Sequence, residues 1–360
     1  MNQTTLLPVD IESMPIIRFS NNLVDDLNIT SAVSLKGWGI KSIDSIDYKS
    51  TLTSIELINS LKYMEMKNLI LNKPSRFCDF TQHIFPYIKE NREQIEKIYS
   101  CWTSVHNILE EFSKNNDIEY IPLKYNMEDP TVLSYELSRI RTPIIFSASL
   151  EERSDKFSTQ MALYNYFSKK GYNVQMVGTK QYGELLGVIN FPQFMFEKKY
   201  SNTEKILKFN QFIKNIEINT VPDLFIIGIP GSVGPFIDNI STHFDDMAYL
   251  ISNAVAADIT VINTLCTPMP PANEVFLQLQ YKYGWVIDDV VINCFLLDYS
   301  LSKTLKKKEY IKICPEYIHK FVNKANENYN EDMFFSYDNV NKLCTIIESK
   351  LVDYGTSNLI

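Results

Sequence analysis

Short, nearly all-apolar segments alternate with amphipathic segments through the second half of the chain. PIIFSAS precedes the helix-forming SDKFSTQMALYNYFSKKG, YNVQMVGT follows it, and EKILKFNQFIKNIE leads through a Val-Pro pair into DLFIIGIPG. A strand that is apolar throughout must be buried on both faces, as happens when helices cover both sides of a parallel sheet. The pattern predicts a mainly parallel α/β domain over residues 143–315.

A similar order of elements is expected before it. Four short apolar segments are predicted to be strands, namely TTLLPVD, NITSAVSLKGWGI, MKNLILNKP and IEYIPL. Long helices are predicted between about Phe77 and Lys114 from the spacing of Ile95, Ile98, Tyr99 and Trp102. A chain of 360 residues exceeds what one core usually serves. We therefore predict a Rossmann-like α/β domain over 1–125, a polar linker over 126–142 and a helical tail over 316–360.

Bulk properties exclude several functional classes. The first residues lack a basic region followed by an apolar run, and no apolar stretch approaches a membrane span, so we expect a cytoplasmic protein without membrane contact. The net charge of −8 argues against binding nucleic acid. The basic run from Lys303 to Lys308 is short and typical of a solvated surface. The six cysteines form no CxxC pair, which favours buried free thiols and no metal site.

The loop between PIIFSAS and the following helix is the main candidate for chemistry. Lys156, Ser158 and Thr159 resemble the K-x-T-T ending of P-loop proteins related to dethiobiotin synthetase, in which such residues bind a nucleotide phosphate and Mg²⁺. Ser149 and Asp155 stand where that pattern has glycines, and Glu151 and Glu152 add negative charge that repels phosphate. The other interpretation is an ordinary helix start capped by Ser154 or Asp155.

Two further features favour the phosphate-site hypothesis. Asp223 opens the buried strand of VPDLFIIGIPGS, in which such folds place an acid that orients Mg²⁺, although Gly228 stands where the catalytic acid belongs. The turn after this strand contains Gly231, Ser232 and Gly234, which permit close approach of the backbone to a ligand. A plain chain reversal explains the turn equally well.

Aromatic residues suggest a surface for a peptide or a protein partner. The segment Gln181–Lys199 contains Tyr182, Glu184, Phe191 and Phe194, which could line a groove or simply fold onto their own domain. Trp38, between Gly37 and Gly39, is a second candidate contact, and packing inside its own domain is the alternative.

Several of these segments together resemble the peptide maturation system proteins, which are encoded beside small precursor peptides and a radical SAM enzyme. The resemblance rests on PIIRF, VSLKGWGIK, DKFSTQ, YGELLG and FPQFMF, and it covers most of residues 10–290. The sequence departs from the family pattern at Phe19 and Gly183, and between Val188 and Asn190, where a histidine, a cysteine and a histidine are expected.

The resemblance implies a role in maturing a ribosomally synthesised, modified peptide, with the precursor peptide or the radical SAM enzyme as partner. Two hypotheses follow. One is a non-catalytic binding module on a degenerate P-loop fold. The alternative is an ATP- or GTP-dependent enzyme in which Lys156, Ser158 and Thr159 bind a magnesium-bound nucleotide and Asp223 places the metal. The lost glycines favour the binding module.

Overall fold

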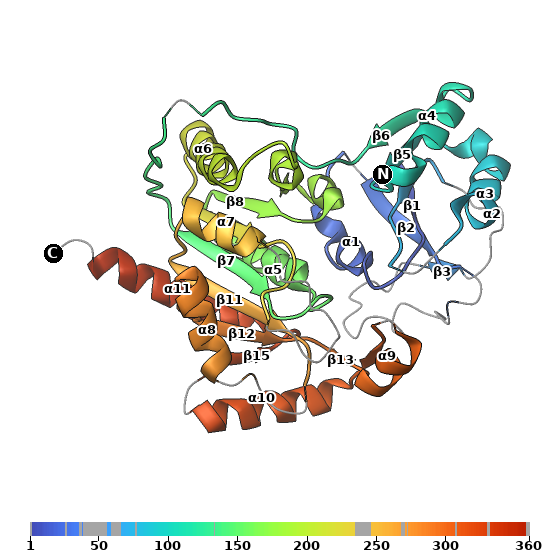
Figure 1. Ribbon diagram of the computed structural model, residues 1–360. Helices are drawn as coiled ribbons and strands as arrows, with labels where there is room; N and C mark the ends of the chain where they lie inside the picture. Colours follow the sequence, from blue (N-terminus) through green and yellow to red (C-terminus); the bar gives the residue numbers. More distant parts are fainter. Residues whose placement is uncertain are drawn as a thin grey trace. The chain divides into compact units, whose positions relative to one another are not determined.

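The computed structural model describes residues 2–25, 27–35, 38, 56–58, 66–75, 78–132, 134–234, 246–267, 271, 273–306, 308–329 and 332–357. The chain divides into two compact units. The first holds Met1–Tyr125 together with Lys180–Asn190, and the second holds Asn126–Thr179 together with Phe191–Ile360. Each unit contains a parallel sheet covered by helices, which confirms the predicted fold class (Figure 1).

The first unit has the strand order of a Rossmann fold. Its parallel sheet runs β3-β2-β1-β4-β5-β6, in which the order reverses beside β1. The strands are β1 (Asn2–Leu7), β2 (Leu27–Val33), β3 (Glu56–Ile58), β4 (Asn68–Leu71), β5 (Lys97–Ser100) and β6 (Glu119–Pro122).

The helices of this unit are α1 (Met14–Arg18), α2 (Phe80–His83), α3 (Phe85–Glu90) and α4 (His106–Lys114). Leu109 of α4 and Ile88 of α3 share one core with Leu71 of β4 and Ile98 of β5. The segment Lys180–Asn190, which the sequence placed in the second domain, adds a short 3-10 turn, Gln181–Leu186, and β9 (Ile189–Asn190).

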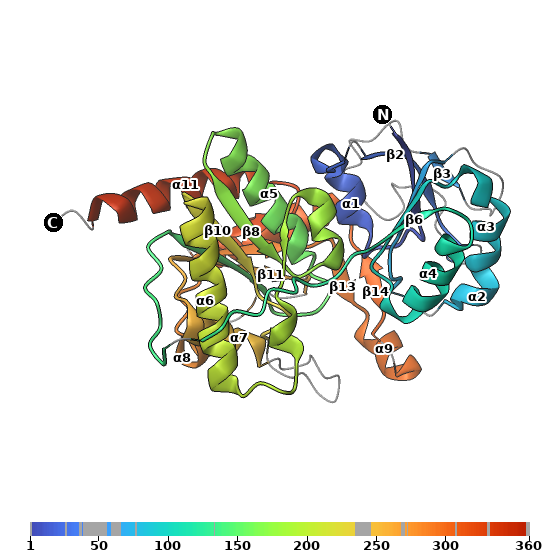
Figure 2. The same ribbon diagram turned by 90° about the horizontal axis from the view of Figure 1, so that it is seen from above.

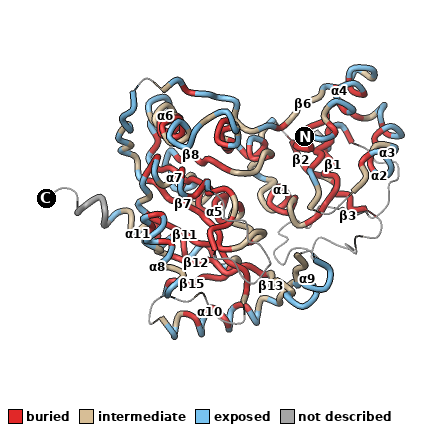
Figure 3. The backbone as a smooth tube through the Cα atoms, in the orientation of Figure 1, coloured by how far each residue is buried: buried red, intermediate tan, exposed pale blue. Residues whose placement is uncertain are grey.

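The second unit is built around β7. Its parallel sheet includes the order β15-β12-β11-β7-β10-β8, and the central strands are buried along their length (Figure 3). These strands are β7 (Ile144–Ser149), β8 (Val174–Gly178), β10 (Leu224–Gly228), β11 (Ile259–Thr264), β12 (Asp289–Ile292) and β15 (Phe334–Ser336). The chain leaves β7 toward β8 and later returns to β11 on the other side of β7. Ligands of α/β proteins bind outside the carboxyl ends of the strands at such a reversal.

Helices cover both faces of this sheet (Figure 2). On one face α5 packs against α11, and on the other α6 packs against α7, which contacts α8. Their bounds are α5 (Lys156–Lys169), α6 (Asn202–Thr220), α7 (Met247–Ala254), α8 (Asn273–Tyr283), α10 (Pro315–Tyr329) and α11 (Val340–Ser357). An arm formed by the antiparallel pair β13 (Phe295–Leu297) and β14 (Tyr310–Lys312), with α9 (Tyr299–Leu305) between them, extends from the carboxyl edge.

Two of the expected element assignments change. β5 lies inside the region in which we predicted only helices, because a short strand buried on both faces shows no alternating pattern that distinguishes it from a helix. The tail beyond residue 315 is helical, as expected, but it also contributes β15 to the sheet next to β12, so it is part of the second unit's core.

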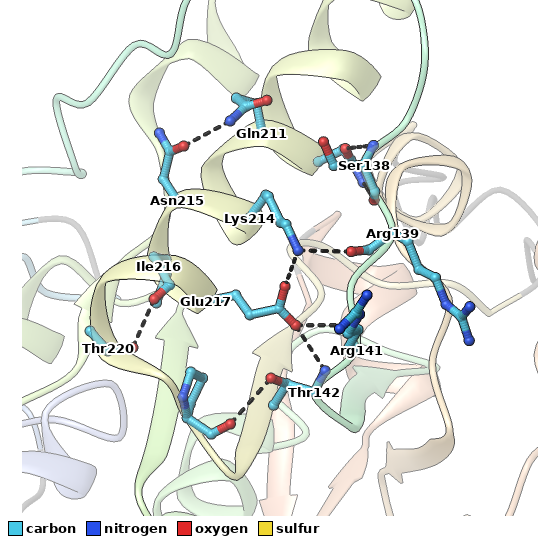
Figure 4. A network of polar contacts seen from close by, with 12 residues as sticks. Ser138, Arg139, Arg141, Thr142, Gln211, Lys214, Asn215, Ile216, Glu217 and Thr220 are labelled. Carbon is cyan, nitrogen blue, oxygen red and sulfur yellow. Dashed lines mark hydrogen bonds and ion pairs between the residues drawn. The ribbon is translucent and has the colours of Figure 1, made fainter. Parts of the chain in front are cut away.

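The predicted linker is a strap held along α6 by side-chain hydrogen bonds (Figure 4). Lys208 Nζ donates to Pro130 O at 2.7 Å, and Asn210 bonds both the backbone N–H and the carbonyl of Ser138, at 2.7 and 3.0 Å. Glu217 Oε1 accepts from the backbone N–H groups of Arg141 and Thr142, at 2.7 and 2.9 Å. These contacts order residues that are polar in sequence, and they place the strap inside the second unit.

We expect Glu217→Gln to lower the stability of the second unit at neutral pH. Burial alone would raise the pKa of Glu217, but the ammonium of Lys214 and the N–H groups of Thr142 and Arg141 outweigh it and hold the pKa at about 2. A depressed pKa stabilises the fold above the unfolded-state value of 4.5, and this contribution is lost as the pH falls toward 2. The substitution should cost about 1–2 kcal/mol at pH 7.

Thermal melting between pH 2 and pH 7 checks this prediction. The difference in Tm between the two proteins should shrink as the pH falls. Glu136→Gln, on the exposed part of the same strap, is the matched control and should leave Tm unchanged. A Glu217→Gln protein as stable as the parent at pH 7 would show that the strap is not held by this charge.

Candidate functional site

The loop that follows β7 lies at the carboxyl edge of the sheet, at the reversal of strand order. It runs from Ser149 to Asp155, directly before α5. Arg153 and Asp155 adopt left-handed backbone conformations, with φ of 63° and 54°. Glycine enters this region without strain, whereas other residues do so at a cost. The chain therefore makes a turn of the P-loop kind without the glycines that usually form it.

The lysine that begins α5 is held by the protein itself. Lys156 Nζ donates to Gly231 O at 2.5 Å and to Ser149 Oγ at 3.2 Å. Gly231 lies 75 positions later in the chain, in the turn after β10. The structure thus brings together two groups that the sequence predicted separately, the lysine of the loop and the glycine turn, and joins them to each other.

The two hydroxyl groups predicted with the lysine point to different places. Ser158 Oγ donates to Asp155 Oδ1 at 2.8 Å, which ties the first turn of α5 to the loop. Asp155 is the N-cap residue, but its carboxylate accepts from this hydroxyl and from no backbone N–H of the first turn. Thr159 is buried and donates to Asn263 Oδ1 at 2.6 Å. Thr159 therefore belongs to the interior, behind the loop.

The turn containing Gly231, Ser232 and Gly234 packs directly against the loop. The N–H of Val233 donates to Ser149 O at 2.8 Å, and that of Gly234 donates to Leu150 O at 2.9 Å. A Cβ atom on Gly234 would lie 2.4 Å from Leu150 O, so only glycine fits there. The close backbone approach that these glycines permit is made to the loop after β7.

Three successive loop residues are anchored to elements from later in the chain. Glu151 accepts from Thr264 Oγ at 2.9 Å and from Leu265 N at 3.2 Å, at the end of β11. Glu152 forms an ion pair with Lys308 at 2.8 Å, and the guanidinium of Arg153 lies 5.0 Å from the centre of the Tyr310 ring. Burial raises the pKa of the Glu151 carboxyl to about 7, against the opposing effect of its two hydrogen bonds.

Gln160 explains the glycine at the end of β10. Its side chain is fully buried on α5, and a Cβ atom on Gly228 would lie 2.7 Å from its amide nitrogen. Neither the amide nitrogen nor the amide oxygen has a hydrogen-bond partner in the part of the chain that the structure describes. The Gln160 amide thus fills the space beside Gly228, the position at which the resemblance to dethiobiotin synthetase implied an acid.

Asp223 does not lie with the other predicted phosphate-site residues. It precedes β10, whereas the loop lies beyond the carboxyl ends of the strands. Five strand residues separate the two edges by about 16 Å. Asp223 Oδ2 accepts from Asn173 N at 2.8 Å, which is a contact within that opposite edge. The sequence correctly placed Asp223 at the start of this strand, but the start of a strand lies at the edge opposite the loop, so the geometry gives no support to its predicted role in placing Mg²⁺.

Most of the predicted contact residues for a peptide are buried. Tyr182 is 3% exposed in the first unit, and Phe191 and Phe194 are 0% and 2% exposed in the second. The rings of Phe191 and Phe209 lie 5.5 Å apart, as expected of a core. These three rings therefore cannot form a partner surface, whereas Glu184 is exposed. Trp38 packs against the core of its own unit, and Gly37 and Gly39 lie outside the described residues.

The residues that complete this arrangement were not identifiable from the sequence. They all lie more than 100 positions after the loop. β11 contributes Asn263 and Thr264, and the arm contributes Lys308 and Tyr310. Within the described residues no group of three acidic, histidine or cysteine side chains could hold a metal ion. None of the described helices is both long and apolar enough to cross a membrane.

Comparisons with known proteins establish similarity of fold. No protein-family model and no curated protein matches the sequence. The chain is similar to a DUF1611 family protein from Anabaena variabilis, with a TM-score of 0.62, 11% identity, and coverage of 98% of this chain and 100% of the other. At this identity the likeness concerns the fold, and it extends over both units.

Two further solved structures match only about half of the chain. The chloroplast FtsY of Physcomitrella patens matches with a TM-score of 0.28 and 14% identity, over 45% of this chain and 53% of the other. The hydrogenase maturation factor HypB of Archaeoglobus fulgidus matches with a TM-score of 0.28 and 12% identity, over 58% and 89%. The P-loop-like character of the second unit rests on its own strand, loop and helix at the reversal of strand order.

Proposed function

We propose that this chain is a cytoplasmic accessory protein in the maturation of a ribosomally synthesised, modified peptide, and that it acts as a non-catalytic binding module for the precursor peptide or its radical SAM enzyme. The pathway comes from the sequence resemblance. The non-catalytic role is supported by one contact above all, the 2.5 Å hydrogen bond from Lys156 Nζ to Gly231 O.

This contact competes with nucleotide binding. A P-loop lysine contributes by directing its ammonium group at the terminal phosphates, and here that group already bonds a carbonyl and a hydroxyl of the protein. A nucleotide would have to replace both bonds and would gain little, because the carboxylate of Asp155 stands directly before Lys156 in the same loop. Each like-charge contact at a few ångströms costs on the order of 1–4 kcal/mol in a partly solvated site.

The second candidate is a nucleotide-dependent enzyme. It is favoured by the position of Lys156 and Ser158 on the first turn of a helix at the reversal of strand order, where α/β proteins bind phosphate. It loses the support of Asp223, which lies at the opposite edge of the sheet. The two functions therefore differ in one measurable property, the dependence of ligand binding on Lys156.

A thermal-shift titration distinguishes them, because a ligand that binds the native state raises its Tm. We expect millimolar magnesium-bound ATP or GTP to leave Tm unchanged, both in the parent protein and in Lys156→Ala. We expect a precursor peptide of the kind that the resemblance implies to raise Tm equally with and without nucleotide. Each variant is compared with its own ligand-free melting curve, since Lys156→Ala alters stability by itself.

The controls and the opposing outcomes are specific. Lys169→Ala, at the other end of α5, controls for the loss of a positive charge on the same helix. A nucleotide-induced shift that survives in Lys169→Ala and disappears in Lys156→Ala would replace the binding module by the nucleotide-dependent enzyme. A precursor peptide that leaves every Tm unchanged would contradict the proposed binding role.

A further inference from the structure

A pocket opens in the second unit at the edge of the sheet opposite Lys156. It has a volume of about 150 Å³ and lies between the start of β10, the end of α5 and the last turns of α11. Its lining includes Phe167, Tyr172, Leu224, Leu351, Asp223 and Glu348. None of these residues belongs to the site around Lys156. Asp223 was predicted to belong there, but it lies at this opposite edge.

The walls of the pocket are aromatic and aliphatic. The rings of Phe167 and Tyr172 have their centres 5.8 Å apart at an interplanar angle of 70°, so they form two walls that meet nearly at a right angle. Phe167 and Leu224 are buried, whereas Tyr172 is 40% exposed and therefore forms the outer wall. A cavity of this volume holds a molecule the size of benzene.

Two carboxylates line this apolar space. Glu348 is neutralised locally, because its Oε2 accepts from Tyr166 at 2.8 Å and forms an ion pair with Lys170. Asp223 is exposed and accepts one hydrogen bond, from Asn173 N to its Oδ2. Its Oδ1 accepts none from the described residues. Because Lys170 neutralises the charge of Glu348, the carboxylate of Asp223 gives the pocket a net negative charge of one, beside two aromatic rings.

We propose that this pocket binds a small organic ammonium ion, with its apolar part against Phe167 and Tyr172 and its charged nitrogen at Asp223. Aromatic faces attract organic cations through the ring quadrupole, and a carboxylate at the rim adds a charge-assisted hydrogen bond. An anion of the same size would meet the charge of Asp223. The assignment is independent of the proposed peptide-maturation role, because it rests on residues at the opposite edge of the sheet.

Two sources can supply such a group, namely a free amine and a lysine side chain of a peptide. The probes are therefore benzylammonium, its neutral counterpart benzyl alcohol, and Nα-acetyl-lysine methylamide, each titrated into the full chain and followed by protein NMR. We expect benzylammonium to bind at least about threefold more tightly than benzyl alcohol at low salt, as is typical of one exposed charge pair. If the natural ligand is a lysine side chain of a peptide, both the lysine derivative and benzylammonium should bind. If the natural ligand is a free amine, only benzylammonium should bind.

Three substitutions locate the effect. Asp223→Asn keeps the acceptor for Asn173 N and should make the two benzyl ligands bind equally. Val352→Trp, at a pocket residue that is 55% exposed, should block both ligands without disturbing the core. Glu274→Gln, on α8, is the control and should change neither affinity. Equal affinity of both benzyl ligands for the parent protein would reduce the pocket to an apolar cavity, and absence of saturable binding would overturn the proposal.

Discussion

Gly234→Ala is expected to lower the free energy of unfolding of the second unit by about 2–4 kcal/mol, the largest effect of a single methyl group that we predict. The added Cβ would lie 2.4 Å from Leu150 O, a backbone atom that cannot rotate away. Relief requires the turn to separate from the loop after β7, which breaks the 2.9 Å hydrogen bond between Gly234 N and Leu150 O.

Thermal melting and limited proteolysis measure this effect. We expect a fall in Tm and faster cleavage in the loop, since the turn holds Ser149 and Leu150 in place. Gly171→Ala is the control. Gly171 has φ of 92°, and a Cβ added to it would meet no atom within 4 Å, so alanine there carries only the backbone cost of about 1 kcal/mol. Equal losses in both variants would mean that the contact with Leu150 contributes nothing.

Glu151→Gln is expected to stabilise the protein, and increasingly so as the pH rises. Burial raises the pKa of the folded-state carboxyl from 4.5 to about 7, so the folded state retains a proton that the unfolded state releases. The stability associated with this proton is fully present below pH 4.5 and is lost as the pH rises through about 7. Glutamine keeps an oxygen for Thr264 and Leu265 and carries no charge.

The gain should reach about 1–3 kcal/mol at pH 8 and vanish near pH 4.5, which melting curves across this range can follow. The gain lies near the lower value of about 1 kcal/mol if water reaches the half-buried Glu151 side chain and reduces the cost of its charge. Glu152→Gln, in the same loop, is the matched comparison and should destabilise, because it breaks the ion pair with Lys308. If Glu151→Gln also destabilised at pH 8, the ionised carboxylate would be an anchor of the loop and its burial would carry no cost.

The strands and helices of the second unit were largely predictable from local pattern. β7, α5, β8, α6 and β10 lie where apolar runs and helical spacing placed them, because a sheet covered on both faces requires fully apolar strands. β5 was missed because its four residues are too few to show a period. The strap along α6 was mistaken for a linker because side chains such as Asn210 and Glu217, far away in sequence, satisfy its backbone groups.

The position of the candidate site in the chain was predictable from the sequence. The hydrogen-bond partners of its residues were not. The sequence located a lysine at the start of a helix after a buried strand, and it showed that Ser149 and Asp155 stand where glycines are expected. It contained no sign that Gly231 O would accept a hydrogen bond from Lys156, since that contact joins residues 75 positions apart. It also assigned Asp223 a role beside Mg²⁺, although a residue that opens a strand lies at the edge opposite the loops that follow the strands.

The amino-acid sequence by itself determined two α/β units, the loop that begins α5 and the charges within it, because these follow from local patterns of apolar and polar residues. Only the tertiary structure decided that Tyr182, Phe191 and Phe194 are buried, that Gln160 fills the space beside Gly228, and that Asp223 lines a separate pocket. Such outcomes depend on which distant segments pack together, and packing is decided by the combined fit of many side chains that no local window contains.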